Sequence, residues 1–358
     1  MRLCYITGSL PPMRDGVGDF AWNICRLLAE TGFSELLTVI RPDVSEPENF
    51  QVLKTDFSLN DLFAVKKNII NFQPDMVLIE YPCLGYGKSL MINLLPALLK
   101  LTRPSVKIAL TIHEYSNYTW KGKVRIALMS LAADRVMVTD RLNFLLLEQL
   151  KNNVKALLPV PPQIPLLIKD QYDCSKNDLV FSYWGFVRPN KGLHLLLPAF
   201  KMYQEKFKDS ELLILADLGD SEYDQKLIKY LNANNLQNNV IISGFLEDEK
   251  LSIALSESDV CILPFTDGIS DRRGTLKAAL AMGIPVISTE LTPDHSPEGL
   301  HSEENILLCQ PDVVMIYKAM LMMNDVNLRN QLGRNALLWS KEQNWDKVAT
   351  ILRKVIID

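Results

Sequence analysis

The chain has 358 residues, of which 48% are hydrophobic and 22% charged, a balance typical of soluble globular proteins. This apolar content excludes a disordered chain, while 16 Gly, 19 Pro and 6 Cys exclude collagen-like and disulfide-dense scaffolds. With 38 basic and 42 acidic residues, the net charge is −4, so the basic excess of a nucleic-acid-binding protein is missing. At about 150 residues per domain, the length predicts two domains.

The first half of the chain alternates short β-branched apolar runs with longer amphipathic segments, the pattern of a parallel α/β domain. The strands expected from this pattern are Leu3–Thr7, Leu36–Ile40, Met76–Glu80, Val106–His113, Arg135–Thr139 and Lys155–Pro159. The helices expected between them are Asp19–Glu30, Asp61–Phe72, Lys88–Lys100, Val124–Ala133 and Arg141–Gln149.

A proline-rich segment then interrupts the alternation. Leu158–Pro165 holds four prolines in eight positions, which excludes a helix or a central strand and predicts an interdomain linker. The alternation restarts with strands expected at Leu179–Tyr183, Glu211–Leu215, Val240–Ser243, Val260–Pro264, Pro285–Thr289 and Asn305–Cys309. The helices expected here are His194–Phe207, Tyr223–Asn234, Glu249–Glu257, Thr275–Met282, Asp312–Met323 and Val326–Glu342. Two such halves predict a ligand in a cleft between them, outside the carboxyl ends of the strands.

No segment predicts a membrane anchor or a metal cluster. The N-terminal apolar run is too short for a signal peptide, and no stretch approaches the roughly 18 apolar residues of a membrane span. The six cysteines occur singly, without a C-x-x-C pair, which argues against zinc or thiol redox chemistry. We therefore expect a cytoplasmic protein.

The first motif is a glycine-containing turn after the first strand, Pro11–Asp19. Gly16 and Gly18 permit close approaches that a side chain would block, and the helix that follows offers free N–H groups to a hydroxylated or anionic ligand. The third glycine of a dinucleotide fingerprint is absent, because Ala21 stands in its place. A plain strand-to-helix turn is the alternative.

Two further motifs follow strands of the second half. Trp184–Gly192 combines glycines with Arg188 and Lys191 before a helix, a set that suits a pyrophosphate. Phe265–Thr275 places Arg272 and Arg273 at a helix start, where cations are disfavoured unless an anion is bound. The alternatives are a solvated basic loop for the first motif and, for the second, neutralisation of the arginines by Asp267 and Asp271.

Together these segments carry a resemblance that covers essentially the whole chain. The chain resembles the retaining glycosyltransferases of glycosyltransferase family 4, also called group 1. The segments that carry the resemblance are Asp15–Asp19, Ile112–Tyr115, Pro159–Pro162, Gly185–Gly192, Ser243–Phe245, Ser258–Val260, Asp267–Val286 and Trp345–Ala349.

The resemblance implies an α/β protein of the GT-B fold, with two Rossmann-like α/β/α domains facing a central cleft. Residues 1–162 would bind the acceptor, residues 163–340 would bind a nucleotide sugar, and residues 341–358 would form a helix that packs back on the first domain. The implied activity is transfer of a sugar from a UDP- or GDP-linked donor, with retention and without a metal or other cofactor, in the synthesis of a surface polysaccharide or glycolipid.

The implied site residues follow from the motifs. His113, Arg188 and Lys191 would be catalytic, and the donor would contact Asp267, Ser270, Arg272, Arg273, Gly274 and Thr275. The acceptor would contact Gly16, Val17, Gly18, Asp19 and Glu114. His113 also has a purely structural interpretation, as an isolated hydrogen-bonded histidine at a strand end.

The chain departs from the family at two carboxylates. The family usually carries a Glu pair in the second domain, and the matching positions hold Ser270 and Ala278. In addition Phe186 replaces the usual Arg just after Gly185. The donor-sugar and ribose contacts are therefore altered, which leaves two alternatives to the transferase. One is a degenerate transferase that acts as a binding or scaffold partner, and the other is a nucleotide-sugar 2-epimerase, which four histidines fit poorly.

The expected partners are a nucleotide sugar and a glycan or lipid-linked acceptor, with no nucleic acid. A small basic cluster, Lys121–Arg125, lies near Tyr115, Tyr118 and Trp120 and suggests peripheral contact with the cytoplasmic face of the inner membrane. A solvated loop is the simpler interpretation, because the run of like charges is short.

Overall fold

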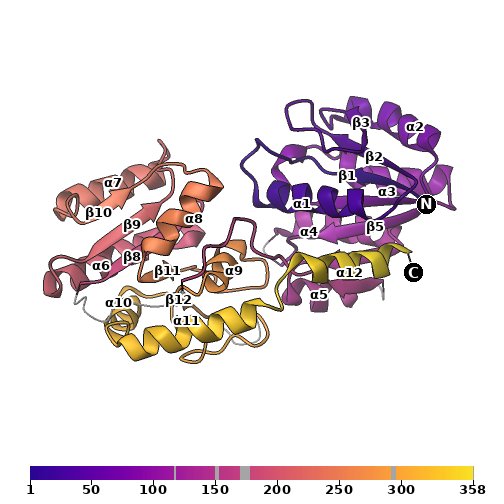
Figure 1. Ribbon diagram of the computed structural model, residues 1–358. Helices are drawn as coiled ribbons and strands as arrows, with labels where there is room; N and C mark the ends of the chain where they lie inside the picture. The colour runs from indigo at the N-terminus through magenta and orange to yellow at the C-terminus, as the bar shows by residue number, and fades with distance from the viewer. Residues whose placement is uncertain (117, 150–152, 170–177, 292–295, 358) are drawn as a thin grey trace. The chain divides into compact units, whose positions relative to one another are not determined.

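A computed structural model describes residues 1–116, 118–149, 153–169, 178–291 and 296–357 (Figure 1). The chain divides into two compact units. The first comprises Met1–Val160 and the C-terminal segment from Trp345, and the second comprises Pro161–Asn344. Each unit is built around its own parallel β-sheet, so each can be described by itself.

The first unit holds a seven-stranded sheet of order β3-β2-β1-β4-β5-β6-β7, with all described pairs parallel. Its strands are β1 (Arg2–Ile6), β2 (Glu35–Ile40), β3 (Gln51–Lys54), β4 (Met76–Tyr81), β5 (Lys107–Ile112), β6 (Arg135–Val138) and β7 (Val154–Leu157). Its helices are α1 (Gly16–Glu30), α2 (Leu62–Phe72), α3 (Met91–Thr102), α4 (Trp120–Ala132), α5 (Arg141–Glu148) and α12 (Trp345–Ile357).

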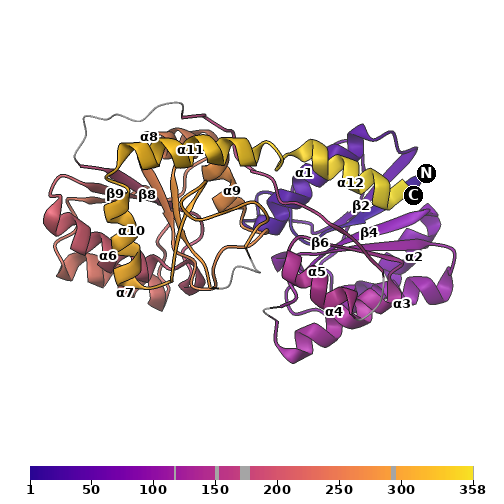
Figure 2. The ribbon, with the colours of Figure 1, turned by 90° about the horizontal axis from the view of Figure 1, so that it is seen from below.

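Helices cover both faces of this sheet (Figure 2). One face packs against α2, α3, α4 and α5, and the other packs against α1 and α12. The central strands are apolar on both sides, as expected for strands that helices cover on both faces. The last helix belongs to this core, since Val348, Leu352, Val355 and Ile356 are all buried against it.

The second unit holds a six-stranded parallel sheet of order β10-β9-β8-β11-β12-β13. Its strands are β8 (Val180–Trp184), β9 (Glu211–Leu215), β10 (Val240–Ile242), β11 (Val260–Leu263), β12 (Val286–Thr289) and β13 (Leu307–Cys309). Its helices are α6 (Leu193–Lys206), α7 (Glu222–Ala233), α8 (Asp248–Glu257), α9 (Gly274–Ala281), α10 (Val313–Met322) and α11 (Val326–Ser340). Helices α6, α7 and α10 pack on one face, and α8 and α9 pack on the other.

The α/β expectation is confirmed, and the strands and helices predicted from the sequence are all present with small shifts at their ends. Two details differ. Strand β3 was not predicted, because it is a short edge strand with polar ends and no apolar run. Helix α1 begins at Gly16 rather than Asp19, because Asp15 caps it by accepting a hydrogen bond from the Val17 N–H.

Both sheets reverse their strand order at one point, between β1 and β4 in the first unit and between β8 and β11 in the second. In open parallel sheets, ligands bind outside the carboxyl ends of the strands at such a reversal. The segments that follow these four strands are therefore the places to look for a site. All three motifs singled out in the sequence lie in them.

Candidate functional site

In the second unit, the segments after β8 and β11 pack tightly against each other. Gly192 has a φ of +76°, and a Cβ there would lie 1.8 Å from the Pro264 carbonyl oxygen. Gly185 has a φ of +110°, and a Cβ there would lie 3.0 Å from Thr275 Cγ2. These two glycines allow the 185–192 segment to lie directly against the strand end and helix start of the third motif.

This packing brings cationic side chains together around Phe265. Arg273 Cζ lies 4.2 Å from the centre of the Phe265 ring, and Lys191 Nζ lies 5.1 Å from the same centre. Arg272 and Arg273 both contact Asp267, at 3.7 Å for Arg272 and with a hydrogen bond from Arg273 Nη2. We call Lys191, Arg272 and Arg273 the cationic cluster.

Asp267 therefore has a role that the sequence left open. Its carboxylate pairs with both arginines, and Arg273 also donates to the Gly268 carbonyl at 3.3 Å. Asp267 was also expected to contact the donor, and the structure shows its contacts with the two guanidinium groups. Asp267 thus offsets part of the positive charge of the two arginines.

The environment of the cluster changes the pKa of Lys191. Burial, followed by the positive charge of Arg273, lowers the pKa of Lys191 to about 7. Arg272 and Arg188 act in the same direction, and Asp267 opposes them. A lysine whose pKa is lowered by burial and by neighbouring cations is expected where a bound anion would restore its charge.

Helix α9 begins within this cluster. Its N-cap is Arg273, no side chain caps it, and its first turn carries no acidic residue. The N-terminal N–H groups and the helix dipole at Gly274 and Thr275 thus add to the positive potential. An anion at this position would offset both the helix dipole and the guanidinium groups.

Two buried polar atoms near the cluster have no hydrogen-bond partner in the described part of the chain. They are Ser270 Oγ and Trp184 Nε1. Both residues adjoin the strand-end segments that form the site, and the Trp184 ring belongs to the same apolar cluster as Phe265. A buried donor without a partner is costly, so a ligand that accepts from it would remove this cost. Ala278, at the second departed family position, is fully buried and packs in the apolar core.

Arg188 differs from the other expected contacts because it is exposed and lies over the Phe186 ring, with Cζ 5.3 Å from the ring centre. It lies in the same segment as Lys191, whose backbone N–H donates to the Arg188 carbonyl at 2.9 Å. Arg188 thus belongs to the same loop but is not buried in the cluster.

In the first unit, the segments after β1 and β4 are also joined. Asp15 Oδ2 accepts from the Leu84 N–H at 3.0 Å, and Ser9 Oγ accepts from the Gly85 N–H at 3.0 Å. Gly18 makes the close approach expected of it, since a Cβ there would lie 3.2 Å from Ser9 Cβ. No atom of another segment lies within 4 Å of the position that a Cβ at Gly16 would occupy. The start of α1 is therefore open to solvent at this residue.

The remaining expected acceptor contacts lie on or near this helix start. Val17 is half-buried and Asp19 is exposed, both in the first turn of α1. Glu114 is half-buried and follows β5. Because the Asp15 carboxylate already occupies the α1 N-terminus, this end of the first unit suits hydroxyl groups better than an anion.

His113, at the end of β5, forms a buried pair with Glu80. Its Nε2 lies 2.7 Å from Glu80 Oε2, and Thr111 Oγ1 donates to the other carboxylate oxygen at 3.1 Å. Phe20 of α1 meets the imidazole edge-on, with ring centres 5.3 Å apart. The histidine is therefore oriented from two sides, by a fully buried carboxylate and by an aromatic ring.

Sequence reasoning missed Glu80, Asp15 and Trp184 as site residues. Glu80 carried a usable signal, because it is the one charged residue in the apolar run Met76–Tyr81, whose carboxyl end points to the strand reversal. Asp15 carried the N-cap signal of an Asp just before a glycine-led helix. Trp184 was the first residue of the second motif, but nothing in the sequence indicated that its indole N–H lacks a partner.

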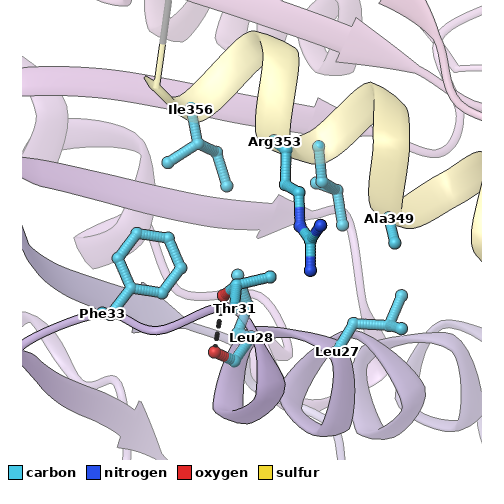
Figure 3. A pocket seen from close by; sticks show the side chains of 8 residues that line it. Leu27, Leu28, Thr31, Phe33, Ala349, Arg353 and Ile356 are labelled. Carbon is cyan, nitrogen blue, oxygen red and sulfur yellow. Dashed lines mark hydrogen bonds between the residues drawn. The ribbon is translucent and has the colours of Figure 1, made fainter.

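A small pocket elsewhere in the first unit does not compete with these positions. It lies between α1 and α12 and has a volume of about 10 Å³ (Figure 3). It is lined mainly by apolar side chains, with Arg353 pointing into it. Ligand sites usually measure about 300–1,000 Å³, so this pocket is a packing gap between two helices. In the described ranges, His, Cys, Asp and Glu side chains do not gather in groups of three that would hold a metal ion.

Comparisons with known proteins agree with this geometry. Residues 178–324 match the family model of glycosyl transferases group 1. An uncharacterized glycosyltransferase from Methanocaldococcus jannaschii is 27% identical over 251 residues, which are 65% of this chain and 59% of that protein. The chain thus spans less than two thirds of the length of that relative.

Solved structures match over nearly the full length. Sucrose-phosphate synthase from Thermosynechococcus elongatus superimposes with a TM-score of 0.78 at 15% identity, covering 99% of this chain and 98% of that one. Anabaena HepE, in complex with UDP and glucose, gives a TM-score of 0.73 at 14% identity and 100% coverage of both chains. Two parallel Rossmann-like units and these similarities establish the GT-B fold, and the family match supports a glycosyltransferase.

Proposed function

We propose that the protein is a glycosyltransferase that moves a sugar from a UDP- or GDP-linked donor to an acceptor in the synthesis of a surface glycan or glycolipid. The observation that carries this proposal is the cationic cluster at the strand reversal of the second unit. Two arginines, an uncapped helix N-terminus and a lysine with a pKa of about 7 form a site for a pyrophosphate. The match to group 1 glycosyl transferases spans this cluster, and the structurally similar HepE binds UDP.

In this proposal the donor pyrophosphate lies against Lys191, Arg272 and Arg273 and receives N–H groups from Gly274 and Thr275. Arg188, exposed on the same loop as Lys191, closes over the phosphates from solvent. Ser270 Oγ and Trp184 Nε1, whose hydrogen-bonding capacity is unused, are available to the β-phosphate or the sugar hydroxyls. Ser270 would then replace a carboxylate with a shorter, neutral hydrogen-bonding group.

The chemistry we propose needs stabilisation of the leaving group more than a protein nucleophile. As the glycosidic bond to phosphate breaks, negative charge grows on the pyrophosphate, and the cluster is already aimed at it. The leaving phosphate takes the proton of the acceptor hydroxyl as that oxygen bonds to the anomeric carbon, so configuration is retained and no metal is required. Removing one charge-assisted contact of this kind should cost about 1.5–3 kcal/mol, or about tenfold to hundredfold in rate.

The first unit would supply acceptor contacts in this scheme. Hydroxyl groups fit the exposed start of α1 at Gly16, Val17 and Asp19, where Gly16 leaves open space. His113, oriented by Glu80 and Phe20, presents an imidazole of fixed direction at the strand edge, with Glu114 beside it. We propose that this imidazole contacts a sugar hydroxyl near the reacting centre.

The test is thermal unfolding of the purified protein with UDP, GDP, ADP and their common sugar derivatives. A ligand at about 100 times its Kd stabilises the folded state by roughly 2.7 kcal/mol. We expect one nucleotide series to raise the Tm, and Lys191→Ala or Arg272→Ala to abolish the rise. Lys201→Ala is the matched control, because Lys201 lies on α6 and pairs with Glu205 away from the cluster. The donor found in this way is then assayed for release of its nucleotide with acceptor extracts.

A second candidate, a non-catalytic binding or scaffold protein, is favoured by one observation. Both family carboxylate positions hold neutral residues, Ser270 and Ala278, and the Ala278 side chain is fully buried. If no nucleotide or nucleotide sugar changes the Tm of the wild type, the transferase proposal is refuted and this candidate takes its place.

A further inference from the structure

The outer surface of α3 and α4 carries two apolar stripes that nothing in the described part of the unit covers. On α4, Trp120, Val124, Leu128 and Leu131 are all exposed, Trp120 to 71% and Leu128 to 61%. On α3, Leu94 and Leu101 are exposed, Leu101 to 79%. Single exposed leucines are ordinary, whereas contiguous exposed apolar side chains often mark an interaction surface.

Helix geometry places both stripes on the same side of the unit. At 100° per residue, the four α4 side chains fall within about 80° of one another. The buried residues of α4, among them Ile126 and Met129, lie on the opposite side of the helix against the sheet. The two helices lie side by side on one sheet face (Figure 2), with Asn93 Nδ2 3.1 Å from Met129 Sδ. Because their buried residues pack against the sheet, the exposed stripes lie on the outer side of the helices.

Basic side chains flank the α4 stripe on both sides. By the same geometry, Lys123 lies about 60° to one side of Trp120, and Lys121 and Arg125 lie about 100–140° to the other. None of these three forms an ion pair with a described carboxylate. When the apolar face of a helix is buried in a membrane surface, lysines and arginines beside that face extend their charged ends to the polar headgroups.

The charge of this region is unusual for the chain. Between Tyr81 and Ala133 there are seven Lys or Arg and one acidic residue, Glu114, although the whole chain has a net charge of −4. Lys100 and Lys107 pair with Asp134, whereas Lys121, Lys123 and Arg125 pair with no carboxylate among the described residues. In addition, Lys121 and Lys123 occupy the first turn of α4, which carries no acidic residue, so they face the positive end of the helix dipole. An anionic surface beside this turn would relieve that repulsion.

We infer that the α3–α4 face docks on an anionic lipid bilayer. The leucines and Trp120 enter the headgroup region, and Lys121, Lys123 and Arg125 contact the lipid phosphates. The contact is peripheral, since among the described residues no helix is long and apolar enough to cross a membrane. A protein partner would need matching carboxylates and an apolar complement, whereas a bilayer supplies both features without further specificity, which is why we favour it.

The inference is tested by sedimentation with vesicles of phosphatidylcholine alone or mixed with phosphatidylglycerol. The wild type should bind the anionic vesicles, bind the neutral ones weakly, and be released by salt. Lys121→Gln with Lys123→Gln should lower the partition coefficient about 25-fold, at about fivefold per charge. Leu128→Glu should lower it at least tenfold. Leu338→Glu, equally exposed at 61% but on α11, is the matched control and should bind as the wild type does.

Three results would overturn the inference. The first is that the wild type does not bind anionic vesicles. The second is that Leu338→Glu lowers the partition coefficient as much as Leu128→Glu does. The third is that the wild type is a dimer in sedimentation velocity and that Leu128→Glu dissociates this dimer without changing vesicle binding. The last would assign the face to a second copy of the chain. The donor-induced rise in Tm, measured without vesicles, should be the same in Leu128→Glu and wild type. A rise in the Tm of Leu128→Glu shows that this variant is folded. If the donor does not raise the Tm of the wild type, the proposed donor site is refuted, but the membrane face is not.

Discussion

The lowered pKa of Lys191 makes donor binding depend on pH in a direction that can be calculated. In the free protein this pKa is about 7, because of burial and the charge of Arg273. A bound pyrophosphate supplies negative charge and should raise it toward the ordinary lysine value of about 10.4. Binding above pH 7 therefore takes up a proton. Lys191→Arg should remove this uptake, because arginine stays charged across the range.

The magnitude follows from linkage. Below the free-state pKa, Lys191 is already charged and the affinity is independent of pH. Above it, the affinity falls about tenfold per pH unit until the bound-state pKa is reached, so at about pH 9 it should be about 100-fold weaker than at about pH 6. The stability of the free protein changes in the opposite sense. The unfolded lysine holds its proton up to about pH 10.4, so the contribution of this lysine to stability increases as pH rises above 7.

The assay is calorimetric titration with a nucleotide sugar from about pH 6 to about pH 9, in two buffers of different ionisation enthalpy. A nucleotide sugar is the right probe because its pyrophosphate is a diester and does not titrate in this range. The wild type should take up nearly one proton per ligand at about pH 8.5. Lys191→Arg should bind with a flat pH profile, and Lys201→Arg should behave as wild type. A flat wild-type profile, or a profile unchanged in Lys191→Arg, would refute the reasoning.

Three further variants test other parts of the site. Gly192→Ala forces a Cβ into the carbonyl of the neighbouring strand end at a φ of +76°, so we expect a loss of about 1–3 kcal/mol in unfolding free energy, measured with denaturant. Ser270→Ala removes a hydroxyl that has no partner in the described chain, so the Tm should stay the same while the donor affinity falls. As a control, Ser182→Ala removes the 2.9 Å hydrogen bond to Ser258 Oγ, so it should lower the unfolding free energy by about 1 kcal/mol without changing the donor affinity. Glu80→Gln keeps the shape of the pair with His113 but removes its charge, so turnover should fall about tenfold or more with donor affinity unchanged, and an equal fall in both would show a structural role only.

Local patterns in the sequence were sufficient to predict the two parallel sheets and almost every helix. Buried strands such as Met76–Tyr81 and Val260–Leu263 are apolar on both faces, so their runs stand out from any context. Strand β3 is the exception, because Gln51–Lys54 pairs at the sheet edge and has no such run. The start of α1 was misjudged because glycine is a poor helix former, and the Asp15 cap that compensates for it was not weighed.

The site was predictable only as separate motifs. The sequence placed Lys191 and Arg273 at helix starts, but their meeting around Phe265 depends on which strands are neighbours and on the Gly192 contact with Pro264. Whether Asp267 neutralises the arginines was likewise open, since charges close in sequence can point apart. The Glu80–His113 pair joins residues 33 positions apart on two strands, and a single sequence gives no indication of that pairing.

The return of the last helix to the first unit has a consequence for how the chain acquires its structure. Residues 161–344 are continuous and can fold as soon as they leave the ribosome, but residues 1–160 lack part of their core until α12 is made. Until then the surface that receives Val348, Leu352 and Ile356 stays uncovered, and the hydrogen bond from Arg135 Nη1 to the Val355 carbonyl cannot form. The N-terminal unit of this protein is therefore the last to be completed during synthesis. A ribosome that stops just after residue 344 releases a complete second unit attached to an incomplete first one.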